Sequence, residues 1–302
     1  MSSNDLLMNN REKVLQAFEK TEKDLAEDVN IIKEWIKGQP HLPEVPSTSI
    51  IESFLVTNKF SIEKTKNKLD MYYSIRTMIP ECFKNSHPNL PHMTEITKYV
   101  QYIPLPKLTK DLFRVNISKI SGNPKYFDVY NFFAHQININ EIRLHEELIL
   151  GDVLLVDLKD VSLGHMVKVT PQHIKKAVLV LEKVFSNRIK QIHLVNPSAS
   201  VDMLVSVLKS TLKQKLADRI QIHNTVETLL NHISSEILPK EYGGTERTVA
   251  ELQELWKQKL QQYGDRFDKL ELLKVNENLR PTPLHNDEVL GYYGNFKTIS
   301  VD

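Results

Sequence analysis

The run VLLVDL at residues 153–158 is apolar up to its aspartate. A continuous apolar run of this length predicts a strand that is buried on both faces. Two more runs rich in β-branched residues follow, RIKQIHLVN at residues 188–196 and IQIH at residues 220–223, and the segments between them have helical patterns. The alternation of strands and helices predicts a mostly parallel sheet with crossover helices.

The helices between these strands have recognisable starts. Thr170 and Pro171 supply an N-cap residue followed by proline at the first helical position. A longer helix is expected from about residue 198 to residue 219, and Asn224 with Glu227 resembles a capping box that starts another helix. The paired glycines of LPKEYGG at residues 238–244 end the alternating block.

The rest of the chain adds helices before the sheet and a strap after it. Residues 112–120 alternate apolar and polar side chains and predict a strand, whereas the proline-punctuated residues 87–106 predict irregular structure. A long helix is expected to end near Leu150. The predicted fold class is α/β, with an N-terminal helical domain at residues 1–90, a sheet domain at residues 91–245, and a C-terminal helix with an extended strap at residues 246–302.

Composition excludes several classes of protein. The 302 residues carry a net charge of +1, so the whole chain is not basic enough to predict a nucleic-acid partner. No apolar run approaches the roughly 20 residues of a membrane span, and the first residues lack the apolar core of a secretion signal. The single cysteine, Cys82, rules out an internal disulfide framework. These features predict a cytoplasmic protein.

The sequence offers no catalytic constellation. His145-Glu146-Glu147 is not followed by a second histidine at the spacing of a zinc helix, and no nucleophile elbow or glycine-rich nucleotide loop is present. Asp157, at the end of a predicted strand, and His193, inside the next one, are the strongest single candidates, and a structural role is expected for each. We therefore predict a protein that is not an enzyme and that needs no cofactor or metal.

The order of these elements resembles the lipid-binding domain of the CRAL-TRIO family, in the branch of the tocopherol and retinaldehyde transfer proteins. IHLVNP and LPKEYGG, at their mutual distance, carry the resemblance, which covers roughly residues 45–245. It implies an apolar ligand cavity closed by a gate helix at residues 198–219. It also implies a set of lining residues, although a plain core role is an alternative for each: Phe133, Ile137, Leu163, Val180, Leu181, Phe185, Ile192, Leu204, Val207 and Leu208.

A local excess of positive charge points to a membrane partner. Residues 160–220 contain ten Lys and Arg against four Asp and Glu. The resemblance implies that Arg188, Lys190 and Lys215 bind phosphoinositide headgroups, and Arg219 lies one helical turn beyond Lys215. A solvated surface is the alternative.

Two departures from the family pattern limit the analogy. In the segment FLVTNKFS at residues 54–61 and just before it, the usual arginine positions read Ser53, Val56 and Asn58. This departure weakens any expected phosphate contact from the N-terminal end. Asn187 replaces the glutamate of the yeast phosphatidylinositol binders, which makes phosphatidylinositol a less expected cargo.

The sequence thus predicts a carrier that binds one tocopherol-, retinoid- or carotenoid-like ligand. It would associate transiently with anionic, phosphoinositide-containing membranes and transfer the ligand between them. The alternative is a scaffold that uses the same domain to bind a membrane or a protein without transporting a ligand.

Overall fold

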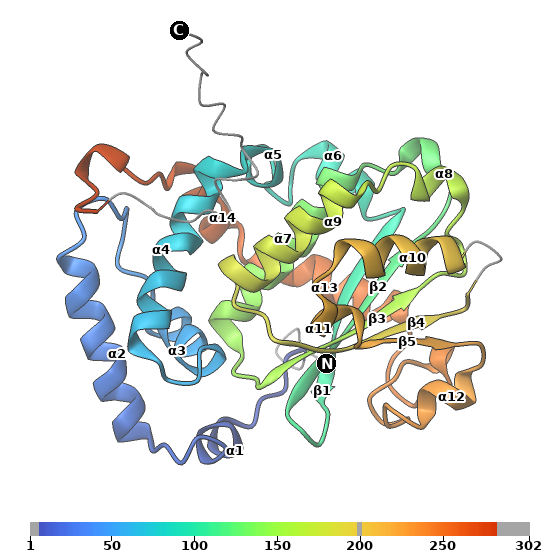
Figure 1. The fold of residues 1–302 in the computed structure, drawn as a ribbon, viewed down its shortest axis with the longest axis horizontal. Helices are drawn as coiled ribbons and strands as arrows, with labels where there is room; N and C mark the ends of the chain where they lie inside the picture. The colour runs from blue at the N-terminus through green and yellow to red at the C-terminus, as the bar shows by residue number, and fades with distance from the viewer. Residues whose placement is uncertain (1–5, 198–200, 283–302) are drawn as a thin grey trace, which may run out of the picture.

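The structure is a computed structural model that describes residues 6–197 and 201–282. A five-stranded sheet lies beside a group of N-terminal helices (Figure 1). None of the described helices is both long enough and apolar enough to cross a membrane.

The sheet confirms the α/β class. Its order is β1-β2-β3-β4-β5, with β1 and β2 antiparallel and all later pairs parallel. The predicted strands at residues 112–120, 153–158, 188–196 and 220–223 are all present. The strands are β1 (Val100–Leu108), β2 (Phe113–Ile120), β3 (Gly151–Asp157), β4 (Ile189–Val195) and β5 (Ile220–His223).

The strands follow one another across the sheet in chain order, and this order decides where the helices lie. Right-handed crossovers that step in one direction place their helices on the same face of the sheet. The helices α9 and α10 lie together on one side of the strands (Figure 1). The crossover helices are α7 (Val129–Glu146), α8 (Leu163–Met166), α9 (Pro171–Leu179) with a π-helical turn (Val180–Val184), α10 (Val201–Thr211) and α11 (Gln214–Ala217).

The opposite face of the sheet is covered by the C-terminal part of the chain. Leu252 and Trp256 belong to one hydrophobic cluster with Val153 and Leu155 of the central strand. The Trp256 indole donates a hydrogen bond of 3.1 Å to the Pro104 carbonyl oxygen. The elements are α12 (Val226–Leu230), a 3₁₀ turn (Lys240–Tyr242), α13 (Val249–Gln262), α14 (Gly264–Leu272) and a second 3₁₀ turn (Glu277–Leu279). Much of the predicted strap, residues 283–302, lies outside the described residues.

The motif LPKEYGG forms a tight turn that requires both of its glycines. Gly243 has a φ of 73°, in the left-handed region that glycine enters without strain. A Cβ atom on Gly244 would lie 1.8 Å from the Leu238 carbonyl oxygen, so no other residue fits there. This turn leads the chain into α13.

The N-terminal helices share a core with the rest of the molecule. Leu25 and Ile32 of α2 are fully buried, and the cluster that contains them continues to Phe133 of α7 and Leu179 of α9. The domain boundaries at residues 90 and 245 remain a prediction. These helices are α1 (Arg11–Gln16), α2 (Glu22–Lys37), α3 (Thr48–Thr57), α4 (Ile62–Met78), α5 (Pro80–Phe83) and α6 (Pro91–Ile96).

Three predicted elements were wrong in part. The prolines at residues 104 and 106 lie in an edge strand, β1, where a missing N–H can be tolerated, so residues 87–106 are not wholly irregular. Of the helix expected at residues 198–219, residues 198–200 lie outside the described part of the chain, and the rest breaks at Lys213, whose ψ of 142° is extended, and splits into α10 and α11. The last predicted helix starts after Thr225, not Asn224, and its N-cap makes no side-chain hydrogen bond.

Candidate functional site

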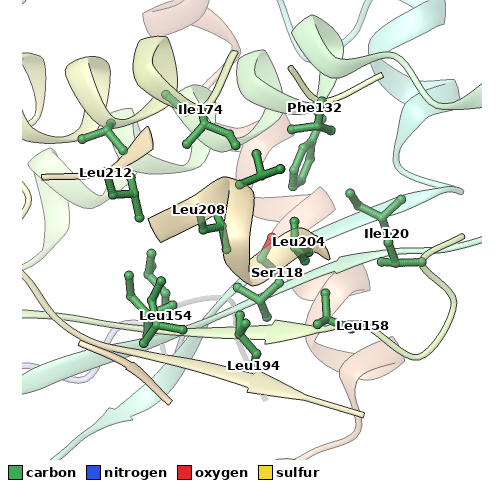
Figure 2. A pocket seen from close by; sticks show the side chains of 18 of the residues that line it. Ser118, Ile120, Phe132, Leu154, Leu158, Ile174, Leu194, Leu204, Leu208 and Leu212 are labelled. Atoms are coloured by element: carbon green, nitrogen blue, oxygen red, sulfur yellow. The ribbon is translucent and has the colours of Figure 1, made fainter. Parts of the chain in front are cut away.

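A cavity of about 280 Å³ lies between the sheet and its crossover helices. Figure 2 shows Leu204 and Leu208 of α10 facing Leu154 and Leu194 of the sheet. The wall is almost entirely apolar. Its other side chains include Ile120 of β2, Val156 of β3, Ile192 of β4, Phe132 and Phe133 of α7, and Ile174, Ala177 and Val178 of α9.

The alternation of side chains along β3 explains why this space is open on one face only. Val153 and Leu155 point away from the cavity and are 1% and 0% exposed. Leu154 and Val156 point toward it and are only half-buried, although β3 is the central strand. A central strand in a filled core would bury both sets. The incomplete burial on the cavity side therefore marks space that the chain does not fill.

The helix α10 covers this space without filling it. None of its side chains for which burial is described is fully buried, and Leu204, Val205, Val207 and Leu208 are half-buried. Three of these four residues, Leu204, Val207 and Leu208, line the cavity. A helix held by so few buried contacts opens at low cost compared with the core.

The structure brings together most of the side chains that were expected to line a ligand cavity. Phe133, Leu181, Ile192, Leu204, Val207 and Leu208 line the main space. Ile137 and Val180 line a smaller void behind it, which Phe133 and Leu181 share. The small void contacts Cys82, and burial raises the pKa of this thiol to about 12.

Two of the expected lining residues lie elsewhere. Leu163 is 56% exposed at the start of α8, because this short helix places it on the outside of the molecule. Phe185 is 2% exposed and packs edge-on against Tyr72 of α4, with ring centroids 6.4 Å apart. The π-helical turn at Val180–Val184 precedes Phe185. An α-helical spacing cannot be extended through such a turn to place Phe185.

Sequence reasoning missed the polar part of the wall. Ser118 of β2, Gln136 of α7 and His165 of α8 all line the cavity, together with Tyr102 and Asp157. They are isolated polar residues in different elements, so no local motif indicates that they meet. Only the topology of the sheet brings them to one space.

The Asp157 carboxylate has a structural role, as expected. It accepts hydrogen bonds of 2.8 Å from the Tyr242 hydroxyl and 2.8 Å from the Asn196 amide, and one of 3.0 Å from the Lys159 backbone N–H. These bonds tie the end of β3 to the loop after β4 and to the turn before α13.

His193 lies on the sheet face opposite the cavity. It is fully buried, its Nδ1 lies 2.8 Å from His223 Nε2, and its Nε2 lies 3.0 Å from Gln191 Oε1. Burial, together with His223 and His232, lowers the pKa of His193 to about 4. Within the described part of the chain, no group of three or more His, Cys, Asp or Glu side chains is placed to hold a metal ion.

A second feature is a basic cluster formed by Lys59, Arg188, Lys190, Lys215 and Arg219. Arg188, Lys190 and Lys59 line an open groove of about 650 Å³, together with Phe18, Phe113, Lys110 and Asp111. Partial burial lowers the pKa of Lys190, and the other four cations of the cluster lower it further. The four cations predicted from the sequence are therefore close enough to interact.

Local geometry explains how the cluster is held. Gly151 has no side chain where Lys190 crosses it, and a Cβ atom there would lie 2.6 Å from Lys190 Cγ. The Lys190 ammonium then lies 5.1 Å from the centroid of the Phe113 ring. The Arg219 guanidinium donates a hydrogen bond to the Ile189 carbonyl oxygen.

Lys59 was not among the predicted residues. It follows α3 in the segment FLVTNKFS, at a turn in which Lys59 and Phe60 both have a φ of 57°. Such backbone is uncommon outside glycine and asparagine, and here hydrogen bonds from the Lys59 and Phe60 N–H groups to the Val56 and Leu55 carbonyl oxygens hold the turn. The expectation that the N-terminal end contributes little was based on Ser53, Val56 and Asn58 and stays a prediction, whereas Lys59, the residue after Asn58, lines the groove.

The fold agrees with comparisons to known proteins. Residues 105–244 match the CRAL/TRIO domain model, and residues 21–93 match the model of a Pinta-like, UBA domain. The central part of the chain therefore resembles the CRAL/TRIO domain. The crystal structure of Sfh5 superposes with a TM-score of 0.50 over 82% of this chain and 92% of that one, at 13% identity, which shows a shared fold.

The chain resembles the tocopherol-transfer branch of this family. It is 28% identical over 222 residues to the alpha-tocopherol transfer protein-like protein of Homo sapiens, a match that covers 72% of this chain and 65% of that protein. Clavesin-1 of Rattus norvegicus is 34% identical over 96 residues, which cover 32% of this chain and 27% of clavesin-1. The match thus spans just under two thirds of the tocopherol-transfer-like relative.

Proposed function

We propose that this protein is a carrier that binds one hydrophobic ligand and transfers it between membranes. The observation that carries the proposal is the apolar cavity of about 280 Å³ beneath the loosely packed helix α10. A packed scaffold, the alternative function, has no need of such a space. The open space under α10 favours the carrier.

The energetics of burial suit this function. Burying roughly 300 Å² of apolar ligand surface at about 25 cal/mol per Å² contributes about 7 kcal/mol. This contribution alone corresponds to a dissociation constant of the order of 10 μM before entropy costs are counted. Ligands of the tocopherol, retinoid or carotenoid kind carry more apolar surface than this, and the name of the human relative points in the same direction.

Release requires a signal at the membrane, and we infer that the basic cluster receives it. Within the described residues, Lys59, Arg188, Lys190, Lys215 and Arg219 have no ion-pair partner. A phosphoinositide headgroup presents many acceptor oxygens, and charge-assisted hydrogen bonds to it are the stronger kind. Arg219 and Lys215 belong to the segment that follows α10, so headgroup binding can favour an open position of that helix by its differential affinity.

The same proposal places the protein in the cytoplasm, with transient association to anionic membranes. It assigns no catalytic residue and no cofactor. The bound ligand leaves the protein chemically unchanged.

Extraction of the purified protein with organic solvent, followed by mass spectrometry, tests the cavity. We expect one class of apolar small molecule in near-stoichiometric amount. If nothing is extracted, and if the neutral dye Nile red neither binds nor is displaced by any apolar ligand, the carrier is wrong and the scaffold stands.

A further inference from the structure

The polar residues of the cavity wall restrict the chemistry of the ligand. We propose that the cavity selects an uncharged amphiphile with one oxygen function, such as an alcohol, through Ser118 and Gln136, and discriminates against fatty acids and other anionic lipids. This inference rests on the proposed function, because it assumes that the cavity holds a ligand.

The described residues that line the cavity include no lysine or arginine. The titratable residues in the wall are Tyr102, Asp157 and His165. Burial raises the pKa of Tyr102 to about 12, and burial together with Lys168 lowers the pKa of His165, so both are neutral at pH 7. The Asp157 carboxylate already accepts hydrogen bonds from Tyr242 and Asn196, and Lys119 Nζ lies 3.9 Å from it. An anionic ligand would therefore meet no cation among the described residues that line the cavity.

An unpaired charge in an apolar space is costly, whereas a neutral hydroxyl needs only a hydrogen-bond partner. Ser118 and Gln136 can supply it. Both are half-buried, and neither side chain has a hydrogen-bond partner among the residues that the structure describes. In a filled core such groups would be paired with the protein.

The two residues lie on different walls. Ser118 lies on the sheet, where its Cα is paired with that of Tyr102 in the β1–β2 ladder. Gln136 lies on α7, and it lines both the main cavity and the small void behind Phe133. A serine hydroxyl and a glutamine amide each donate and accept hydrogen bonds, so either residue can bind an alcohol in either role. The rest of the cavity wall is apolar and suits the hydrocarbon part of the ligand.

His165 contributes a third neutral polar group to the same wall. Its Nδ1 accepts a hydrogen bond of 3.2 Å from the Ser162 backbone N–H, which places the proton of the neutral ring on Nε2. That Nε2 is buried and has no partner within the described residues. The wall therefore holds a neutral donor as well as two groups that both donate and accept.

The test uses three ligands of equal chain length: 1-hexadecanol, hexadecane and hexadecanoate. Each is delivered from cyclodextrin at pH 7.4, and displacement of bound Nile red is measured. For the unaltered protein we expect hexadecanol to bind about fivefold more tightly than hexadecane, the effect of roughly one net hydrogen bond. Hexadecanoate should be the weakest of the three.

The double variant Ser118→Ala/Gln136→Met removes both polar groups, and we expect its ratio of hexadecane to hexadecanol dissociation constants to fall toward one. Asn131→Met is the matched control, because it makes the same kind of change on α7 outside the cavity wall. It should keep the ratio of the unaltered protein.

The outcomes separate the two proposals. If no ligand displaces the dye and none is extracted from the protein, the carrier itself is wrong, and this inference falls with it. If hexadecanoate binds as tightly as hexadecanol, the carrier stands and the selection of neutral ligands is overturned. If the double variant keeps the preference for the alcohol, other groups recognise the oxygen, and the assignment to Ser118 and Gln136 is wrong.

Discussion

Replacing Arg188, Lys190 and Lys215 with alanine is predicted to remove the response of ligand transfer to phosphoinositide in the acceptor membrane. These three side chains belong to the basic cluster, and none contributes to the wall of the ligand cavity. The change should therefore act on the membrane step and leave the affinity for the ligand intact.

The size of the effect follows from where each cation lies. A cation near an anionic membrane contributes about 1 kcal/mol, so three contribute about 3 kcal/mol, or roughly 100-fold in membrane affinity. Lys215 is exposed, whereas Arg188 and Lys190 are half-buried in the groove. Nonspecific electrostatic attraction to the membrane surface would involve Lys215 alone, and its loss would lower the membrane affinity about fivefold. The full effect requires a headgroup that enters the groove.

The assay is the transfer of a fluorescent apolar ligand to vesicles with and without a doubly phosphorylated phosphoinositide, at fixed ionic strength. The control replaces three exposed lysines that lie outside the cluster, Lys84, Lys240 and Lys274, and so matches the change in net charge. An equal loss in both triple variants would show a general charge effect. Stimulation by the lipid that is the same in all three proteins would refute the role of the cluster.

Three further predictions concern the cavity, the core and pH. Leu181→Trp should fill the cavity and abolish Nile red binding while thermal unfolding stays cooperative, and unchanged binding would remove Leu181 from the site. Asp157→Asn should lower the free energy of unfolding by about 1–3 kcal/mol in urea titrations, because buried partners lose a charged acceptor; transfer activity should persist. His135 is 6% exposed, and burial, with a smaller effect of Lys257, lowers its pKa from 6.5 to about 4. As the pH decreases, His135 is protonated in the unfolded chain before it is protonated in the folded chain. The free energy of unfolding should therefore fall between about pH 6.5 and about pH 4, by about 3 kcal/mol for this group. His135→Gln should flatten that slope in urea titrations at several pH values, and an unchanged slope would assign it to other groups.

The central sheet could be predicted because its strands are long, apolar and separated by helices with clear caps. VLLVDL and RIKQIHLVN are buried in adjacent parallel strands, and such strands leave little choice of structure. The strand β1 was missed because its prolines at residues 104 and 106 break the local pattern. Prolines are tolerated only because β1 lies at the edge of the sheet, and a position in the sheet is not a local property.

The candidate site was predictable where one element supplies several residues. Leu204, Val207 and Leu208 lie on the single helix that the resemblance implied as the gate, and all three line the cavity. Phe185 was misplaced because a π-helical turn precedes it, and no pattern in the sequence marks that turn. Lys59 was missed because a left-handed turn carries it to β4, more than a hundred residues away in the chain. Ser118 and Gln136 come from different elements and line one space only once the sheet and α7 are in place.

The half-buried helix α10 has a consequence for the lifetime of the protein. Without ligand, α10 has few core contacts, so this segment opens more readily than the rest. A ligand present at about 100 times its dissociation constant would stabilise the folded chain by about 2.7 kcal/mol. The empty form is then the one that proteases cut first. The abundance of such a protein would follow the supply of its cargo, with no dedicated regulator.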